Sequence, residues 1–332
     1  MIKNTFSLGL FLLALLIAPQ IAFSYCPQTD KVGWSFSDAL LYWEAYEHGL
    51  GFTTKPSDIL TTDDFTHKKV VNPTYKWQWG FRLGAGYTMC DRLWTFQGYW
   101  THLDSRAHGD KSVNSDAPDF QGIFPVWSLS DDTLASDYVS AANTSWRLHT
   151  NIADIQAEYN WMGLLCDKLT VMPFLGLRGV GLTQSMKVKY AGGTFFTGVD
   201  INKLHSRYYG GGIRGGVNLD YYLTCGFSLF GRAAVAPLFG VEHLHLREKY
   251  FHTERYFHTS EKYKFMLSTD YQIGVRWKGL VLDNWPYFIL SASWEGQEFF
   301  FANQFTRSRF NFFSKHRGLF LQGLTLDATI DF

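Results

Sequence analysis

The chain ends with LFLQGLTLDATIDF, residues 319 to 332. Counting back from Phe332 in steps of two gives only apolar residues as far as Leu324, whereas the residues between them are polar, as Asp331 and Asp327 illustrate. A period of two is that of a β-strand with one apolar and one polar face. A soluble sheet can also end in this way, so the interpretation depends on whether the rest of the chain repeats the pattern.

The repetition is clearest between Tyr75 and Met89. The odd positions of this segment are aromatic or aliphatic, whereas the even positions hold glycine and polar residues, Gln78 and Arg82 among them. Lipid favours bulky apolar side chains on the outer face of a strand, and the curved interior of a barrel favours small ones. The segment therefore predicts a membrane-spanning strand whose odd face, which includes Trp79, points into lipid.

Ten such strands follow one another along the chain. The first three are expected at 34–44, at 75–89, and from the turn near 91 to about 102. The other seven are expected at 146–161, from 169 past 178, and at 209–221, 227–237, 265–278, 286–294 and 319–332. Tight turns near 91, 167, 225 and 283 alternate with long polar loops, an asymmetry typical of outer-membrane barrels with short periplasmic turns. The predicted fold is all-β, an antiparallel transmembrane β-barrel of ten strands over residues 25–332. A further hairpin within the irregular stretch 103–144 would make it twelve.

The first 24 residues have the pattern of a secretory signal peptide. Lys3 precedes an apolar run over Phe6 to Ala18, Pro19 interrupts it, and small residues at the expected positions favour cleavage after Ser24. The uninterrupted run is shorter than the roughly 20 residues that a membrane-spanning helix needs. We therefore expect export through the periplasm to the bacterial outer membrane, whose lipid surrounds the barrel.

Composition narrows the classes of function. Phe, Trp and Tyr make up 18% of the 332 residues, and 30 basic residues balance 30 acidic ones. Aromatic richness without long apolar runs fits a β-barrel. Because the chain has neither a basic run nor an aromatic-basic motif, we expect no nucleic-acid partner.

Two motifs that suggest an enzyme have simpler explanations. Gly210-x-Gly212-x-x-Gly215 matches a dinucleotide fingerprint, yet the alternation continues to Tyr221 where that fingerprint requires a helix. The acid pairs Asp63-Asp64 and Asp131-Asp132 stand in predicted loops without a recognisable nucleophile and base. We therefore expect no catalytic residues and no cofactor.

Two further features concern histidines and the phase of one strand. A predicted loop carries His243, His245, His252 and His258. Their spacing is not that of a zinc site and they lack cysteine partners, so we expect no metal. The strand at 146–161 changes the parity of its apolar residues near Ile152, and a β-bulge there would restore a single outward face.

Charged residues recur on the predicted inward faces, about halfway along the strands. They are Arg82, Asp154, Glu158, Arg178, Arg214, Arg232 and Arg276. One interpretation is a charged constriction that lines a pore and screens solutes. The other is that these charges pair across strands and fill the interior; Arg232, for example, lies within diagonal reach of Asp220 across their shared turn. Both interpretations stay open from the sequence.

Several blocks resemble a known family. They are Leu41-Tyr42-Trp43; Trp146, Asn151 and Asp154 followed by Pro173-Phe174-Leu175-Gly176-Leu177-Arg178; Trp294-Glu295-Gly296-Gln297 with Asn303-Gln304-Phe305; and Leu321-Gln322-Gly323-Leu324-Thr325-Leu326 leading to Asp331-Phe332. The blocks span nearly the whole mature chain, and the set is similar to the pore-forming major outer membrane proteins of Legionella and Chlamydia-like bacteria. The resemblance implies an outer-membrane barrel that forms a pore, and it supplies no catalytic residues.

The function we expect is passive diffusion of small hydrophilic solutes or ions through an outer-membrane pore. The number of strands opposes a wide pore, because eight strands enclose a filled interior and aqueous channels have sixteen or more. The alternative is a non-conducting surface barrel whose long extracellular loops serve adhesion or host contact.

The four cysteines suggest contacts between chains. Cys90, Cys166 and Cys225 fall in or beside predicted periplasmic turns, and Cys26 precedes the first strand. Neighbouring turns lie ~10 Å or more apart, beyond the ~7 Å between Cα atoms that a disulfide spans. The three turn cysteines should therefore not bridge one another, whereas Cys26 can reach Cys90. The resemblance implies that at least one turn cysteine forms a disulfide with another chain, so we expect disulfide-linked or homo-oligomeric partners; free thiols are the alternative.

Overall fold

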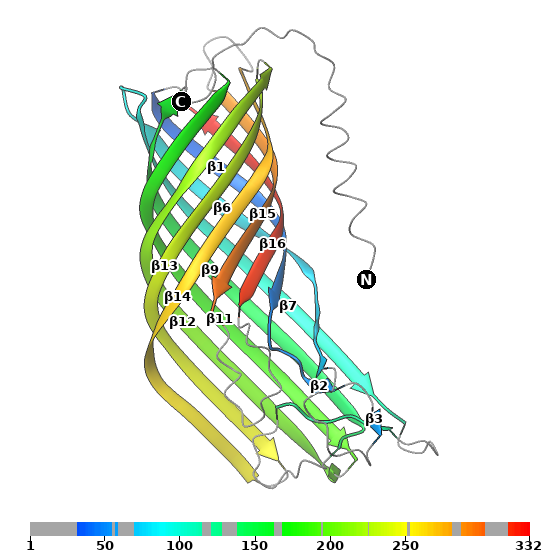
Figure 1. Cartoon of the computed structure of the whole chain (residues 1–332). Coiled ribbons are helices and arrows are strands. Elements are labelled where there is room, and N and C mark those ends of the chain that lie inside the picture. Colours follow the sequence, from blue (N-terminus) through cyan, green and yellow to red (C-terminus); the bar gives the residue numbers. More distant parts are fainter. Residues whose placement is uncertain are drawn as a thin grey trace.

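The computed structural model describes residues 32–54, 57–58, 70–114, 121–127, 138–162, 168–193, 195–224, 226–250, 253–280, 287–302 and 318–332. The predicted signal peptide and Cys26 lie outside these residues. The described part of the chain forms one tilted antiparallel β-barrel, with the C-terminus at one end and longer strands reaching the other (Figure 1). No helix in these residues is long and apolar enough to cross a membrane.

Ten strands form the wall of the barrel. They are β1 (Gly33–Glu47), β6 (Trp77–Thr88), β7 (Trp94–Ser112), β9 (Ala141–Tyr159), β11 (Leu169–Gly192), β12 (Phe195–Thr224), β13 (Phe227–Tyr250), β14 (Thr253–Leu280), β15 (Tyr287–Phe300) and β16 (Leu319–Asp331). Each strand pairs with its neighbours in chain order, and β1 closes the barrel by pairing with β16 over thirteen residues, from Ser35↔Asp331 to Glu47↔Leu319. Closure leaves neither of these strands with a free edge, which the absence of water in lipid requires. The ten-strand prediction is confirmed.

Six short strands accompany the barrel. They are β2 (Thr53–Thr54), β3 (Ser57–Asp58), β4 (Val70–Val71), β5 (Thr74–Tyr75), β8 (Gln121–Gly122) and β10 (Trp161–Met162). β2 pairs with β4 and β3 with β8, at the end of the barrel opposite the C-terminus (Figure 1). The described residues of the predicted 103–144 loop thus add no hairpin to the wall, and the count stays at ten.

The outward face near the C-terminal end is mainly apolar on every strand, with Asp38 on β1 as a charged exception. Trp79, Leu177, Ile213, Phe239 and Ile273 each expose between 59% and 68% of their surface. On β6 the odd residues point outward, and on β16 the even residues from Leu324 to Phe332 do, as predicted. We take the following segments as membrane-spanning: 34–42, 79–87, 94–100, 153–159, 169–177, 209–223, 227–241, 263–277, 288–294 and 324–332.

The barrel continues well past this apolar band on one side. β12 has 30 residues and β14 has 28, whereas β6 and β16 have 12 and 13. The short-turn end is periplasmic and the long end extracellular, following the rule for outer-membrane barrels. Parts of two predicted loops are therefore strand instead. The loop before residue 209 contributes the start of β12, and the histidine loop contributes the end of β13 with His243 and His245 and the beginning of β14 with His258. His252 lies outside the described residues.

In the extracellular part the two faces exchange character. The inward residues Leu103, Leu148, Leu182 and Leu204 are at most 3% exposed, and the outward residues of the same part of these strands are largely polar. Strand β9 keeps one register against both neighbours, so the predicted bulge near Ile152 is wrong. The apolar residues of β9 change parity because they face outward to lipid in the membrane-spanning part and inward to a core in the extracellular part.

Segments between the strands complete this extracellular core. The Tyr190 hydroxyl donates to the Phe52 carbonyl at 2.5 Å and accepts the backbone N–H groups of Val126 and Trp127 at 3.1 Å. The Trp127 indole donates to the Gly51 carbonyl at 2.7 Å. Residues 50–54 and 122–127 are therefore hydrogen-bonded to each other through Tyr190 and lie buried against the long strands.

Candidate functional site

The interior of the membrane-spanning part carries the chain's densest polar cluster, and Arg178 on β11 lies at its centre. Its guanidinium makes a bidentate pair with Asp154 on β9, at 2.7 and 2.8 Å. The same group reaches Asp270 on β14 at 2.9 Å and Ser268 at 3.0 Å. Only 1% of the Arg178 side chain is exposed, so this cation is held by carboxylates on two separate strands.

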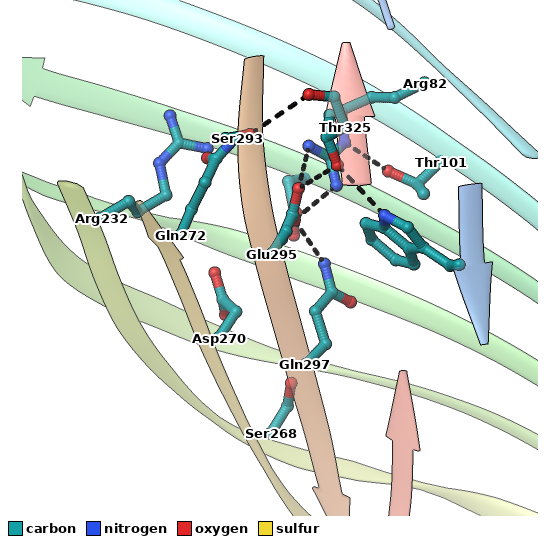
Figure 2. Close-up of polar contacts among 12 residues, drawn as sticks. Arg82, Thr101, Arg232, Ser268, Asp270, Gln272, Ser293, Glu295, Gln297 and Thr325 are labelled. Atoms are coloured by element: carbon teal, nitrogen blue, oxygen red, sulfur yellow. Dashed lines mark hydrogen bonds and ion pairs between the residues drawn. The ribbon is translucent and has the colours of Figure 1, made fainter. Parts of the chain in front are cut away.

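A second pair joins strands on the other side of the barrel. Arg82 on β6 donates to both carboxylate oxygens of Glu295 on β15, at 3.0 and 2.7 Å, and to Thr101 at 2.9 Å. Figure 2 shows that Glu295 also accepts from Gln297 and Thr325, at 3.1 and 3.2 Å. Because β16 and β1 separate the two charged strands, this pair crosses the lumen.

Arg232 on β13 extends furthest across the interior. It donates to Asn218 at 2.7 Å, and its guanidinium lies 5.9 Å from the ring centroid of Tyr99 on β7 and 6.0 Å from that of Phe174. Strands β9, β11 and β12 lie between β13 and β7 in the wall, so the side chain nearly spans the barrel. The interpretation in which Arg232 pairs with Asp220 is therefore wrong.

The remaining predicted charges also have partners inside the barrel. Asp220 pairs with Arg276, at 2.8 Å. Arg214 donates to Asp270 and to Gln156 and lies over the Phe174 ring. Glu158 accepts from Gln156 at 2.5 Å and from Asn218 at 2.8 Å.

All seven charged residues named from the sequence thus point inward. Hydrogen bonds and ion pairs link five of them, Asp154, Glu158, Arg178, Arg214 and Arg232, whereas Arg82 and Arg276 form separate pairs with Glu295 and Asp220. The sequence-based set lacked several of the acceptors, among them Gln156, Asn218, Asp270 and Glu295. Alternation alone put Asp220 and Asp270 on inward faces, but it could not show which cation each one meets. Arg82 and Glu295 are 213 residues apart, and only closure of the barrel brings them together.

An apolar layer lies above the charged one, toward the extracellular side. Trp43, Leu103, Met266, Phe299 and Leu321 point inward there and are fully buried. Water has little room beside such side chains, because protein interiors are close-packed. The lumen is therefore occupied by ion pairs below and by a mainly apolar layer above, which also holds the buried pair of Lys264 and Glu242.

Other predicted features have these outcomes. β12 continues as strand through Gly210 to Thr224, so the dinucleotide interpretation does not apply. Among the described residues no group of three metal-ligating side chains is close enough to hold an ion. Cys90 is an exposed free thiol in the turn between β6 and β7. Cys26, Cys166 and Cys225 and both acid pairs lie outside the described residues, and no disulfide is seen in the described part.

The closed barrel, the apolar outer band and the long extracellular strands define a class, the outer-membrane β-barrel proteins of bacteria. Within that class the family is shown by sequence. The chain belongs to the family of the Legionella pneumophila major outer membrane protein, whose model matches residues 25–332. It is located in the bacterial outer membrane. No curated protein sequence matches the chain.

Comparison with solved structures found matches at low sequence identity. The outer membrane protease OmpT from Escherichia coli is 8% identical, with 95% of this chain and 99% of that chain covered and a TM-score of 0.44. A FadL homologue from Pseudomonas aeruginosa is 7% identical, with 90% of each chain covered and a TM-score of 0.26. The toluene transporter TodX from Pseudomonas putida is 8% identical, with 90% of this chain and 89% of that chain covered and a TM-score of 0.26.

Proposed function

We propose that the protein is a non-conducting surface barrel whose extracellular strands and loops act in contact with other surfaces, and that it is not an enzyme. The observation that carries the proposal is the occupied lumen. The side chains of Arg178, Arg214 and Asp270 are at most 4% exposed. A diffusion channel needs a continuous aqueous path, and such a path would leave interior charges in contact with water.

The extracellular part supports the same proposal. A core that includes Tyr190, Trp127 and Phe52 holds segments 50–54 and 122–127 in place above the membrane. A rigid platform of this kind presents loops at low cost in conformational entropy, which favours binding to a partner. Passive diffusion of solutes or ions, the function first expected from the sequence, is the competing proposal.

Single-channel recording separates the two. The mature chain, refolded and inserted into planar bilayers, should give no conductance steps above the background of empty bilayers. A variant with Arg178→Ala and Arg232→Ala, which removes the two longest cross-barrel cations, serves as a comparison if it folds, since it should admit brief openings. Stable, ohmic openings of the unmodified chain would refute the proposal and support a pore.

The exposed thiol of Cys90 supports a second, separate proposal, namely disulfide linkage to another chain at the periplasmic rim. Disulfides persist in that oxidising compartment. Native envelopes run on non-reducing gels, with thiols blocked before lysis, should contain a reductant-sensitive species above the monomer that Cys90→Ser diminishes. A monomer band alone would contradict the linkage.

A further inference from the structure

The outer face of the extracellular strands carries an unusual concentration of positive charge. Among the outward cations, six lie on three adjacent strands, two on each: Lys187 and Lys189 on β11, Lys203 and Arg207 on β12, and Arg247 and Lys249 on β13. We call this set the cationic face. The whole chain has no net charge, so this excess of positive charge is a local feature of the fold.

The cationic face places like charges opposite one another. Lys187 pairs directly with Lys203 on the next strand, and Lys203 pairs directly with Arg247 on the strand after that. Adjacent strands lie about 4.8 Å apart, and like charges directly opposite destabilise a sheet. The charge of Lys189, with partial burial and the charge of Lys203, lowers the pKa of Lys187 below its ordinary value. The repulsion among these cations therefore opposes folding of this part of the sheet.

Acidic side chains do little to compensate for it. At the adjoining end of β14, the Glu254 carboxylate contacts Arg247 at 2.9 Å and lies 3.7 Å from Lys249. None of the ion pairs found in the described part of the chain involves Lys187, Lys203 or Arg207. Arg207 donates through Nε to His205 at 2.9 Å. The other N–H groups of its guanidinium and the ammonium groups of Lys187 and Lys203 are thus available to an anion from outside the protein.

The height of the cationic face indicates where that anion resides. On β12, Arg207 is the first outward residue after Tyr209, the last large apolar residue of the membrane-spanning segment. With a rise of ~3.3 Å per residue and a tilt of ~45°, Arg207 lies ~5 Å and Lys203 ~14 Å above Tyr209. The headgroup zone of a membrane begins at this boundary.

The opposite wall of the barrel differs. There the outward residues at the same boundary are Tyr42 and Glu44 on β1, Glu298 on β15 and Gln322 on β16, with no cation among them. A general attraction to anionic membrane surfaces would be expected to surround the barrel. Outward arginines on the next two strands, Arg147 on β9 and Arg106 on β7, continue the positive charge along the same wall. Concentration on this one side of the barrel points to one bound molecule with several anionic groups.

We propose that the cationic face binds the phosphate groups of a phosphorylated glycolipid of the outer leaflet, with the acyl chains of that lipid lying against the apolar band below. Lysine and arginine both bind phosphate, and arginine does so with two parallel hydrogen bonds. The apolar surface directly beneath the cations is supplied by Leu177, Ile213 and Phe239, which are between 59% and 67% exposed. The inference depends only on the outer-membrane location and holds whether or not the barrel conducts.

The test uses the full mature chain refolded in detergent and two probes. One probe is diphosphorylated lipid A, and the other is the same lipid after enzymatic removal of its phosphates. Binding is measured by native mass spectrometry and by the shift of the thermal unfolding midpoint. We expect the phosphorylated probe to bind at least tenfold more tightly, with an advantage that decreases as sodium chloride is raised.

A matched pair of variants assigns the binding to the cationic face. Lys187→Gln, Lys203→Gln and Arg207→Gln together should remove most of the tenfold preference. Lys76→Gln, Arg92→Gln and Lys168→Gln remove the same charge at exposed positions elsewhere and should leave it unchanged.

Three results would overturn the proposal. One is equal binding of the two probes by the unmodified chain, a measurement that needs no variant. Another is an unchanged preference in the first triple variant. The third is full competition by millimolar inorganic phosphate, which would assign the face to a free anion rather than to a lipid.

Discussion

Strand β11 passes through both regions of the molecule and shows how differently they are built. Near the periplasm, Leu175 and Leu177 point outward with 65% and 62% of their surface exposed, while Arg178 points inward at 2%. Further along the same strand, Leu182 and Tyr190 point inward at 3% and 0%, and outward positions such as Lys187 are polar. The backbone and its pairing are the same in both regions; only the medium outside the strand changes.

The difference shows that the hydrophobic effect, not strand geometry, decides which face is apolar. Lipid surrounds the lower region, so bulk hydrocarbon lies outside and the polar groups pair within. Water surrounds the upper region, so apolar side chains collect inside as in a soluble protein. A charge should therefore be tolerated on opposite faces in the two regions, and substitutions along β11 can break or sharpen this comparison.

The largest effect is expected for Leu182→Arg, in the upper region. The new cation would be buried without a partner, and we expect a loss of more than about 4 kcal/mol of stability or failure to fold. Thr183→Arg, its neighbour on the outward face, should cost less than about 1 kcal/mol. Heat-modifiable mobility on gels and urea unfolding in vesicles measure both. Similar losses for the two variants would contradict the apolar upper core.

A smaller but still large effect is expected for Arg178→Met, in the lower region. The substitution leaves Asp154 and the part of Asp270 that Arg178 satisfied buried without their cation, at a cost of about 3–5 kcal/mol. Arg147→Met, at an exposed position on β9, is the control and should change stability by less than about 0.5 kcal/mol. Urea unfolding in vesicles compares the stabilities of the two variants. An unchanged stability of Arg178→Met would mean that the barrel does not need this charged network to be stable.

An intermediate loss is expected for Leu175→Arg, on the lipid-facing side of the lower region. A cation near the middle of a lipid-facing strand costs about 2–4 kcal/mol. Together with Leu182→Arg and Thr183→Arg, this variant completes a comparison in which inward and outward positions of the same strand exchange their sensitivity. If Leu175→Arg and Thr183→Arg cost the same in vesicles, the membrane boundary on β11 is misplaced.

The smallest effect concerns pH and Glu47, in the upper region at the end of β1. Burial raises the pKa of its carboxyl from the ordinary value of 4.5 to about 8; the nearby Glu242 raises it too, and Lys264 opposes the shift. Between these two values the folded state holds a proton that the unfolded chain has released. Stability should therefore decrease as pH rises through this range and be fully present below it.

The unfolding midpoint should consequently be higher at pH 5 than at pH 8.5 by a few degrees, with about 2–4 °C for each kcal/mol. Glu47→Gln, which imitates the protonated form, should reduce the slope and raise the midpoint at pH 8.5. Glu254→Gln, an exposed control, should leave the slope unchanged. Thermal scans at both pH values decide; an undiminished slope in Glu47→Gln would remove Glu47 as its source. Asp200, whose pKa burial raises to about 7, contributes with the same sign.

Alternation in the sequence was sufficient to predict the closed barrel, the ten strands and the outward faces of β6 and β16. It failed on β9, where Trp146 and Leu148 share a parity with the inward Ile152, because we assumed that an apolar face must be the lipid face. Strand ends were misplaced for the same reason: the outward faces of β12 and β13 above the membrane are polar, as a loop would be.

The charged interior was predicted only in part. Parity and distance from the turns placed Arg82, Arg178 and Arg232 inside the barrel. They could not assign partners, since Glu295 and Asp270 meet these cations across the lumen and not along one hairpin. The cationic face had no signal in overall composition, because the total charge balances and only the register of β11, β12 and β13 brings its members together.

The most direct measurement of the change between regions is an accessibility scan along β11. Single spin labels at positions 173 to 190, in a chain whose native cysteines are replaced by serine, are read in liposomes by collision with oxygen and with a water-soluble nickel complex. We expect odd positions up to 177 to favour oxygen, odd positions from 183 to favour nickel, and even positions from 180 to collide with neither. Nickel access at those even positions would reveal a water-filled lumen, and oxygen preference at 183 to 189 would place the upper region in lipid; either result would contradict the account.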